Sequence, residues 1–320
     1  MHSITKNWSE LKFQPHSRIM FFAPHPDDES LAAGVLLQNL IAVGAAVRVI
    51  YATDGDDNRW PQRAEERKWR LGALDRERWG RRRRREAIAA LEALGLQAAD
   101  ARFLGLPDQG LTTRLLHDCS KITQRLGGMI REWTPTDLVM PSLSDTHPDH
   151  SALAVLIRVA LRRWFLTGRR PVEWSYLVHG RRAAFARVAR EFPQSDNAIK
   201  IKRRAIECHK SQLKLSRKRF LAYAKRTELF HPVVAGGPRD RTSTIRSITR
   251  TCDKLRLSLI IKPRPIPVAE AELYLVGCGD ALAPLGVRLH LPTRNARVQL
   301  SNCATGRRIG VGIYRGNASH

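Results

Sequence analysis

The segment Phe-Phe-Ala-Pro-His-Pro-Asp-Asp-Glu-Ser, residues 21–30, joins two different patterns of hydrophobicity. Residues 18–23 are apolar and β-prone, whereas residues 30–37 place apolar side chains at helical spacing. The prolines and acidic residues between the two patterns are typical of a loop. We therefore expect a buried strand, a polar loop and a helix in succession. Ligands of open α/β sheets bind at the carboxyl ends of strands, so this loop is a candidate site.

Three side chains of this loop suggest metal chemistry. His25 and Asp28 are three residues apart in a turn, close enough to bind one cation, and this donor pair suits zinc and also ferrous iron. Asp27 points in a different direction, and a carboxylate left free beside a metal is a candidate general base. The alternative is an acidic loop that only caps a helix, because carboxylates are favoured at helix N-termini. A third metal ligand has to come from elsewhere.

A second loop, residues 144–150, repeats the arrangement with the sequence Ser-Asp-Thr-His-Pro-Asp-His. A strand-like segment at 137–141 precedes it, and a helical pattern begins at 151. Two such loops at one edge of a sheet would bring together His25, Asp28 and one histidine of the second loop. This set leaves a coordination position open for water, as catalytic zinc sites require. A helix cap with a chance histidine is the weaker alternative, because the two loops agree.

Several motifs together resemble the LmbE-like/PIG-L zinc-dependent N-deacetylases. Pro24-His25-Pro26-Asp27-Asp28-Glu29 is similar to the family signature A-H-P-D-D-E, and His147-Pro148-Asp149-His150 is similar to its H-x-D-H motif. Further matches follow in the family's order: residues 51–55 (T-D-G), residues 83–86 with 94–95 (R-x-x-E…L-G), residues 104–111 (L-G-L-P-D-G-G-L), and residues 202–212 (K-x-x-A-x-x-x-H-x-S-Q). The resemblance covers about residues 17–232 and is specific because order and spacing agree. Pro24 replaces the usual alanine of the first motif.

The resemblance implies a set of site residues with three roles. They are His25, Asp28 and His150 as metal ligands, Asp27, His147 and Asp149 as catalytic residues, and Arg83, Asp108 and His209 as substrate-binding residues. The implied cofactor is Zn²⁺, with Fe²⁺ as the alternative.

The roles within that set are expectations of different kinds. Asp27 would act as the general base and His147 as the acid that also stabilises the oxyanion. Asp149 would orient His147 by a hydrogen bond and raise its pKa. Arg83, one of five successive arginines at 81–85, would lie near the sugar at the mouth of the pocket. For His209 a pocket-lining role and a packing role are equally weighted.

The activity implied by the resemblance is that of a hydrolase acting on a linear amide C–N bond. It would remove the N-acetyl group from an amino sugar, an N-acetylglucosaminyl conjugate, and release acetate and a free amine. Two alternatives remain. One is a metal-dependent amidase for another small acylated conjugate, and the other is a basic nucleic-acid-binding protein on a degenerate scaffold. Intact ligand, base and acid positions argue against the nucleic-acid-binding protein.

The hydrophobic patterns predict an α/β fold, with a Rossmann-like, mostly parallel sheet flanked by helices. We expect an N-terminal arm at 1–16, a deacetylase-like domain at 17–235 with basic helices at 198–227, and, after a linker at 233–238, a small β-rich extension at 236–320. The predicted strands are 18–23, 47–53, 101–106, 137–141 and 173–179, then 255–261, 271–276, 287–291 and 307–314 in the extension. The predicted helices are 29–43, a region within 62–95, 111–133 and 149–166.

The net charge of the 320-residue chain is +25, from 55 basic and 30 acidic residues. Such a charge fits phosphate-rich partners, but basic residues spread over most helices with little aromatic interleaving favour a solubilising surface. The expected partner is a small glycoconjugate, which can be anionic. Nucleic acid is not favoured, and peripheral contact with an anionic membrane remains open.

Cysteine usage and the N-terminal sequence indicate a cytoplasmic protein. The five cysteines are scattered and odd in number, without a C-x-x-C pair, which argues for a reducing compartment. Residues 1–8 lack an apolar signal core, and no apolar run approaches the ~20 residues that span a membrane.

Overall fold

The computed structural model describes residues 13–164, 170–187 and 189–233, and the backbone of six strands between residues 245 and 315. The chain divides into two compact units, Met1–Val234 and Ala235–His320. The predicted N-terminal arm and linker lie largely outside the described residues.

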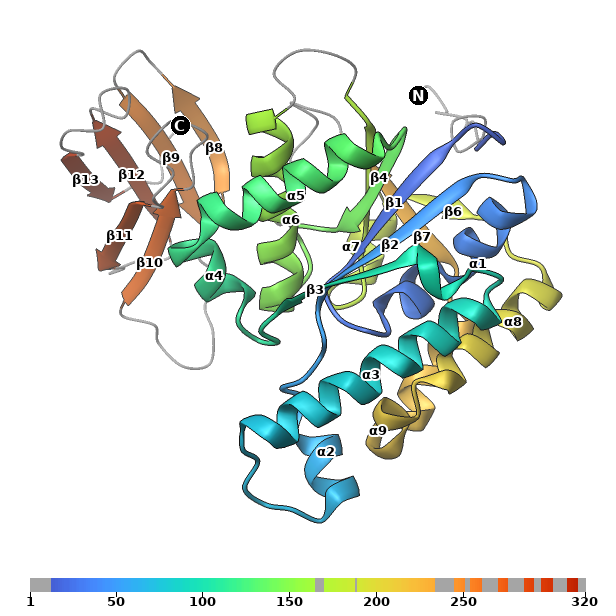
Figure 1. Ribbon diagram of the computed structural model, residues 1–320. Helices are drawn as coiled ribbons and strands as arrows, with labels where there is room; N and C mark the ends of the chain where they lie inside the picture. The colour runs from blue at the N-terminus through green and yellow to red at the C-terminus, as the bar shows by residue number, and fades with distance from the viewer. Residues whose placement is uncertain are drawn as a thin grey trace. The chain divides into compact units, whose positions relative to one another are not determined.

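A seven-stranded sheet in the order β3-β2-β1-β4-β5-β7-β6 forms the centre of the first unit (Figure 1). The neighbouring strands β3, β2, β1, β4 and β5 are all parallel. Strand β7 runs antiparallel to its two neighbours, β5 and β6. The predicted α/β fold with a mostly parallel sheet is therefore confirmed. The strands are β1 Arg18–Ala23, β2 Ala46–Thr53, β3 Ala101–Leu106, β4 Asp137–Pro141, β5 Val172–Tyr176, β6 Arg190–Phe192 and β7 Glu228–Pro232.

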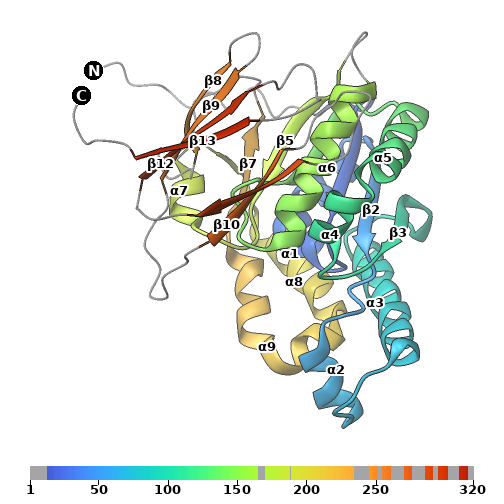
Figure 2. The same ribbon diagram turned by 90° about the vertical axis from the view of Figure 1, so that its left-hand side faces the viewer.

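Helices cover both faces of this sheet (Figures 1 and 2). On one face α8 packs against α1 and α3, and on the other face α6 packs against α4 and α5. Helices α2 and α9 contact each other beyond the carboxyl edge. The helices are α1 Asp28–Ala42, α2 Arg59–Glu66, α3 Ala73–Ala93, α4 Leu111–His117, α5 Cys119–Trp133, α6 Pro148–Trp164, α7 Arg182–Ala186, α8 Asp196–Cys208 and α9 Lys210–Ala222, with short 3₁₀ turns at Ala98–Asp100 and Tyr223–Lys225.

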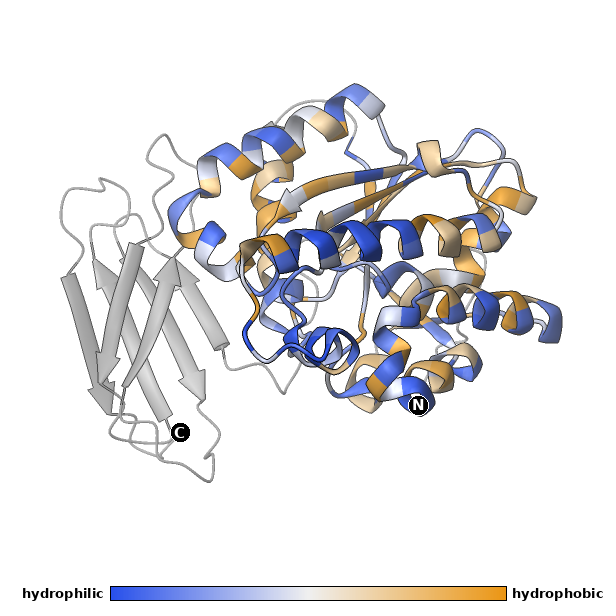
Figure 3. Cartoon of the chain, turned by 60° about the horizontal axis from the view of Figure 1, so that its bottom comes forward, coloured by the Kyte–Doolittle hydropathy of each residue, from blue (hydrophilic) through white to orange (hydrophobic). Residues whose placement is uncertain are grey.

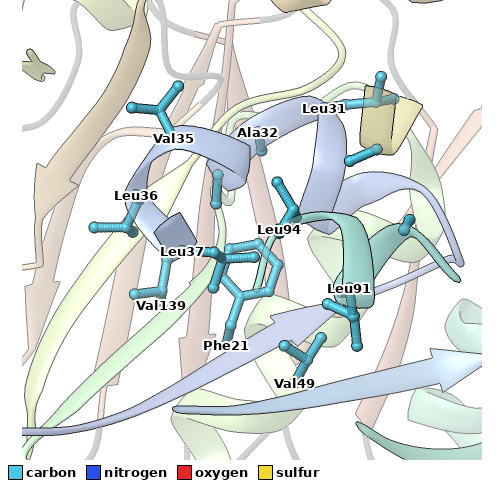
Figure 4. Packing of buried hydrophobic residues seen from close by; sticks show 14 of the residues in the cluster. Phe21, Leu31, Ala32, Val35, Leu36, Leu37, Val49, Leu91, Leu94 and Val139 are labelled. Carbon is cyan, nitrogen blue, oxygen red and sulfur yellow. The ribbon is translucent and has the colours of Figure 1, made fainter. Parts of the chain in front are cut away.

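Strand β1 is apolar on both sides because both faces of the sheet are covered. Phe21 belongs to the core cluster of α1 and α3, where it packs with Leu37, Val49 and Val139 (Figure 4). The alternate residues Met20 and Phe22 are equally buried. Figure 3 shows the same division, with hydrophobic residues in the strands and hydrophilic ones on the outer sides of the helices. The central strand is thus fixed by burial on both sides.

The strand order places the two motif-bearing loops next to each other. From β1 the chain continues to β2 and β3 on one side, whereas β4 pairs with the other side of β1 and leads to β5. The loops after β1 and β4 therefore meet at the carboxyl edge where the strand order reverses. Such a switch point is where open α/β sheets bind ligands.

A buried ion pair supports α1 just after the first loop. The backbone of α1 is non-helical at Ala33, and the carboxylate of Glu228 accepts hydrogen bonds from the freed N–H groups of Val35 (2.7 Å) and Leu36 (2.9 Å). Lys202 Nζ donates to the same carboxylate at 2.8 Å, and both side chains are fully buried. The pair thus holds the part of α1 that follows the kink, next to the first turn that carries the acidic motif.

Lys202→Met is expected to destabilise the protein by about 3 kcal/mol, because it leaves the Glu228 charge buried without its partner. Urea unfolding measures the loss of free energy of unfolding. Arg203→Met is the matched control, since Arg203 is exposed and pairs weakly with Glu207 at 3.3 Å, so a change within about 0.5 kcal/mol is expected. Equal stability of the two variants would contradict the assigned role of the buried pair.

The second unit is built of antiparallel strands. A four-stranded sheet has the order β13-β12-β9-β8, and β10 pairs with β11. Four of its strands lie close to predicted ones, whereas β8 and β12 were not predicted because polar residues interrupt their short apolar patterns. The strands are β8 Ile245–Arg250, β9 Lys254–Ile260, β10 Glu270–Leu275, β11 Leu285–His290, β12 Asn295–Ser301 and β13 Gly310–Arg315. Within the described part of the chain, no helix is both long and apolar enough to cross a bilayer.

Candidate active site

The three residues expected to bind a metal lie together, with both histidine rings close to one carboxylate oxygen of Asp28. Asp28 Oδ2 lies 3.4 Å from His25 Nδ1 and 3.3 Å from His150 Nε2, and it accepts a hydrogen bond from the backbone N–H of His25 at 2.9 Å. His25 is 8% exposed, Asp28 1% and His150 not at all. The loop after β1 and the start of α6 therefore bring two imidazoles and a carboxylate into one buried cluster.

The state of His150 shows that this cluster fits a cation. Neither ring nitrogen of the buried His150 has a hydrogen-bond partner, although Asp28 and Asp145 lie on its two sides at 3.3 and 3.2 Å. Burial lowers the pKa of His150, but these two carboxylates outweigh burial and raise it to about 9. The surroundings therefore favour positive charge at the imidazole. Nitrogen and oxygen donors in this number suit a divalent metal such as zinc or ferrous iron.

The described residues also allow other ligand sets around the same point. Donor atoms lie within 4.8 Å of one another in three groups: His25, His147 and His150; Asp28, His150 and His179; His25, Asp108 and Asp149. The predicted set is thus one choice among overlapping ones, and metal analysis of variants can distinguish them.

Asp27 has an unusual backbone conformation and a buried carboxylate. Its φ of 145° lies in the region that disfavours residues with a Cβ, and Glu29 Oε2 accepts its backbone N–H at 3.0 Å. The Asp27 carboxylate accepts a hydrogen bond from Arg83 Nη2 at 2.8 Å. Burial raises the pKa of Asp27 to about 6, although the Arg83 charge opposes this shift. A carboxyl group with such a pKa can exchange a proton near neutral pH.

Arg83 lines the cleft as expected, but it does so from the interior and is not exposed at the mouth. It is 2% exposed, and it also donates to the backbone oxygens of Pro26 (2.7 Å) and Gly55 (3.0 Å). A Cβ at position 55 would lie 1.9 Å from the guanidinium, so only glycine permits this approach. Arg83 Nη2 therefore holds Asp27 and the loop after β1, whereas Nη1 holds the loop after β2.

Asp149 contacts His25, which differs from the expected hydrogen bond between its carboxylate and His147. Asp149 Oδ2 lies 3.2 Å from His25 Nε2 and accepts the backbone N–H of Gln109 at 2.7 Å, while Oδ1 accepts that of Leu111 at 3.0 Å. The structure therefore places the Asp149 carboxylate between the first loop and the start of α4.

His147 is held by a backbone group of Asp149 instead. The Asp149 N–H donates to His147 Nδ1 at 3.2 Å, so a neutral imidazole carries its proton on Nε2. Burial, followed by the charge of His25, lowers the pKa of His147. This is opposite to the expected direction, because the carboxylate that was to raise the pKa faces His25. His147 is thus suited to donate a hydrogen bond as a neutral ring.

Asp108 and His209 have different positions relative to the cleft. Asp108 lines it, with Oδ1 3.1 Å from His25 Nε2. His209 is 1% exposed and does not line it; its Nε2 lies 3.0 Å from Glu29 Oε1 and 3.2 Å from Ser30 Oγ. The packing role considered for His209 therefore agrees with the geometry, and His209 supports the glutamate that holds the Asp27 backbone.

The cleft above the cluster has a volume of about 190 Å³ and includes residues that sequence reasoning missed. His179, in the connection after β5, had been absorbed into a predicted strand, although it follows a strand that ends at the same edge. Gln212 is the last residue of the K-x-x-A-x-x-x-H-x-S-Q motif, and Asn58 follows β2. The missed lining residues are Leu31, Asn58, Gln109, His179, Gln212, Arg219 and Phe220.

Fold and site together define an α/β protein with a buried cluster of histidine and aspartate side chains at its switch point, which could hold a cation. Residues 20–161 match the family model PIG-L, described as GlcNAc-PI de-N-acetylase. A similar curated protein is the 1D-myo-inositol 2-acetamido-2-deoxy-alpha-D-glucopyranoside deacetylase of Mycobacterium avium (strain 104). It is 31% identical over 150 residues, which cover 42% of this chain and 47% of the relative. The chain thus spans about half the length of the curated relatives it matches.

Solved structures show the same fold with different activities. A deacetylase of the teicoplanin biosynthesis pathway, in complex with bog, matches with a TM-score of 0.54 and 20% identity, covering 68% of this chain and 98% of that one. GalB, the 4-carboxy-2-hydroxymuconate hydratase from Pseudomonas putida KT2440, matches with a TM-score of 0.50 and 18% identity, covering 70% and 97%. The fold therefore does not determine the reaction, which has to be argued from the site.

Proposed function

We propose that the first unit is a metal-dependent N-deacetylase. It would hydrolyse the acetamide of an N-acetylglucosaminyl conjugate and release acetate and a free amine. The observation that carries this proposal is the convergence of His25, Asp28 and His150 beside Asp27, whose raised pKa suits a general base. The description of the matching family and the names of the curated relatives support the same reaction.

His25, Asp28 and His150 would hold the metal, which we propose to be zinc, with ferrous iron as the alternative. Bound there, a divalent metal polarises the acetamide carbonyl and lowers the pKa of water from 15.7 towards ~7. The Cys208 thiol, which forms no disulfide, is compatible with a reducing compartment such as the cytoplasm.

The chain's own residues divide the proton transfers. Asp27 accepts a proton from the attacking water, while Arg83 keeps its carboxylate in place. As the water oxygen bonds to the carbonyl carbon, negative charge develops on the carbonyl oxygen, and His147 Nε2–H stabilises it by a hydrogen bond. Asp27 then returns its proton to the nitrogen as the C–N bond breaks. Acetate and the amine are the products.

His147→Ala is expected to lower kcat by about 10²-fold with little change in metal content, because one donor to the developing oxyanion is lost. Steady-state acetate release and metal analysis provide the two readouts. His147→Gln is the informative partner variant, since its amide nitrogen can replace Nε2 and should recover part of the loss. A normal kcat in His147→Ala would remove this residue from the mechanism.

The proposed substrate class is tested with a panel of acylated compounds. N-acetylglucosaminyl substrates with different aglycones are compared with small N-acetyl amides that lack a sugar, with acetate measured in each case. We expect release from the sugar substrates. Release only from the non-sugar amides would favour the alternative amidase, and binding of nucleic acid without any acetate release would favour the non-enzymatic alternative.

A further inference from the structure

Asp145 is a buried residue of the second loop that the proposed mechanism does not use. It lies between β4 and α6, two residues before His147, and its side chain is completely buried. Burying a carboxylate is unfavourable unless hydrogen bonds or opposite charges replace its lost hydration. The groups that surround Asp145 therefore indicate what this carboxylate does.

Three histidines contact the Asp145 carboxylate, two through the backbone and one through its ring. The backbone N–H of His147 donates to Oδ1 at 3.0 Å, and that of His179 donates to Oδ2 at 3.0 Å. The backbone N–H of Val178 also donates to Oδ2 at 3.0 Å, and His150 Nδ1 lies 3.2 Å from the same oxygen. Asp145 therefore connects the loop after β4, the start of α6 and the segment after β5.

The contact with the His150 ring decides which of its nitrogens can bind a metal. Asp145 lies beside Nδ1, whereas Asp28, a proposed metal ligand, lies 3.3 Å from Nε2. In a neutral imidazole, a carboxylate beside Nδ1 favours the proton on that nitrogen and leaves the Nε2 lone pair for a metal ion. Asp145 therefore orients His150 so that its free nitrogen faces the same point as Asp28.

The two backbone contacts position the other histidines at the cleft. His147 and His179 both line it, and their ring centroids are 5.4 Å apart. The backbone N–H of Thr146 donates to the carbonyl oxygen of His179 at 3.2 Å, so the two segments are also bonded next to Asp145. One carboxylate thus holds a proposed metal ligand and the proposed oxyanion donor, His147, in a fixed relation to each other.

We propose that Asp145 is a positioning residue that orients His150 for metal binding and fixes His147 relative to that ligand. Asp145 is not among the residues that line the cleft, so it acts through these two histidines. The part that concerns His147 rests on the proposed deacetylase function, whereas the part that concerns His150 requires only that the cluster binds a metal. A carboxylate that merely joined two loops would contribute to stability and leave metal affinity unchanged.

The test measures zinc affinity by competition with a chelator. Asp145→Asn is expected to weaken zinc binding by about 10- to 100-fold, the usual cost of losing the carboxylate partner of a histidine ligand. Asp137→Asn is the matched control, because Asp137 begins β4 at the end away from the cleft and accepts from Thr136 Oγ1 (2.7 Å) and Trp174 Nε1 (3.0 Å). The control should bind zinc like wild type. Urea unfolding without metal checks the stability of both variants, since both lose hydrogen bonds.

A measurement on the wild-type protein tests the proposal even if Asp145→Asn does not fold. Nitrogen NMR of zinc-loaded protein with labelled histidines should show His150 protonated on Nδ1 and metal-bound through Nε2. Zinc on Nδ1 of His150 would overturn the proposal, and so would wild-type zinc affinity in Asp145→Asn.

Activity gives a third readout. With zinc saturating, Asp145→Asn should still have a kcat about 10-fold below wild type and a nearly normal KM, because His147 is displaced from the developing oxyanion. Absence of acetate release by wild type would overturn the proposed function, and the zinc and NMR measurements would still decide the role of Asp145 at His150.

Discussion

Asp27→Asn is expected to lower kcat by about 10³-fold while the bound metal is retained. The amide has nearly the shape of the carboxylate and can still accept the hydrogen bond from Arg83, which lies 2.8 Å away, but it cannot take a proton from water. Because Asp27 is placed beside the ligands and not among them, metal content should stay normal. Acetate release and metal stoichiometry measured on one preparation give both quantities.

Asp118→Asn provides the control for this experiment. Asp118 pairs with Arg114 at 2.6 Å on the surface, outside the cleft, so its loss removes a carboxylate without touching the site. The control should keep a kcat close to that of wild type. A near-normal rate in Asp27→Asn would contradict the general-base assignment, and a loss of metal in the same variant would assign Asp27 to the ligand set.

Removal of any one of His25, Asp28 and His150 by alanine is expected to weaken metal binding by more than ~100-fold and to abolish turnover. Loss of a residue that only supports a ligand already costs ~10–100-fold in affinity, so loss of a ligand should cost more. Metal per protein, measured after dialysis against a buffered metal concentration, checks this directly. Activity should follow the metal content.

Three further alanine variants distinguish the predicted ligand set from its neighbours. Asp108, His147 and His179 each belong to one of the other groups of donors within 4.8 Å. If His25, Asp28 and His150 bind the metal, these three variants should stay nearly fully loaded. Loss of metal in His179→Ala together with retention in His25→Ala would instead assign the metal to Asp28, His150 and His179.

The sequence was sufficient to locate the cluster because both loops follow strongly apolar segments. Each apolar segment predicts a buried strand, and the carboxyl ends of parallel strands share one edge. The meeting of His25 and Asp28 with a histidine of the second loop therefore followed from pattern alone, whereas the choice of His150 came from the family resemblance. Their spacing could not indicate which carboxylate would face which imidazole, and Asp149 was assigned to His147 although it contacts His25 at 3.2 Å.

The position of Arg83 depends on how α3 is oriented. The sequence predicted only that a helix lies within residues 62–95, without its orientation. Among the successive arginines, Arg82 pairs with Glu65 and Glu86, and Arg84 with Asp54, while only Arg83 turns inward to Asp27. Because successive residues of a helix point in different directions, the five arginine side chains cannot all face the same neighbour. Which side of α3 faces the loop after β1 is set by the packing of α3 on α8. Tertiary contacts of this kind have no local signal.

Residues of α9 were missed for a similar reason. The kink at Ser216 decides that Arg219 enters the cleft, and no proline or glycine marks it in the sequence. The buried partner of Lys202 was also hidden, because Glu228 lies on β7, a five-residue strand that the patterns did not predict. Short strands and helix irregularities are set by their neighbours more than by their own residues.

The most direct test of the account measures acetate and free amine together, from one N-acetylglucosaminyl conjugate, before and after the metal is removed. Zinc-loaded protein should release the two products in equal amounts, lose this activity when a chelator strips the metal, and regain it when zinc or ferrous iron is restored. Asp27→Asn loaded with the same metal should remain nearly inactive. Hydrolysis that continues at full rate without metal, or a loaded protein that releases no acetate from any such conjugate, would contradict the account.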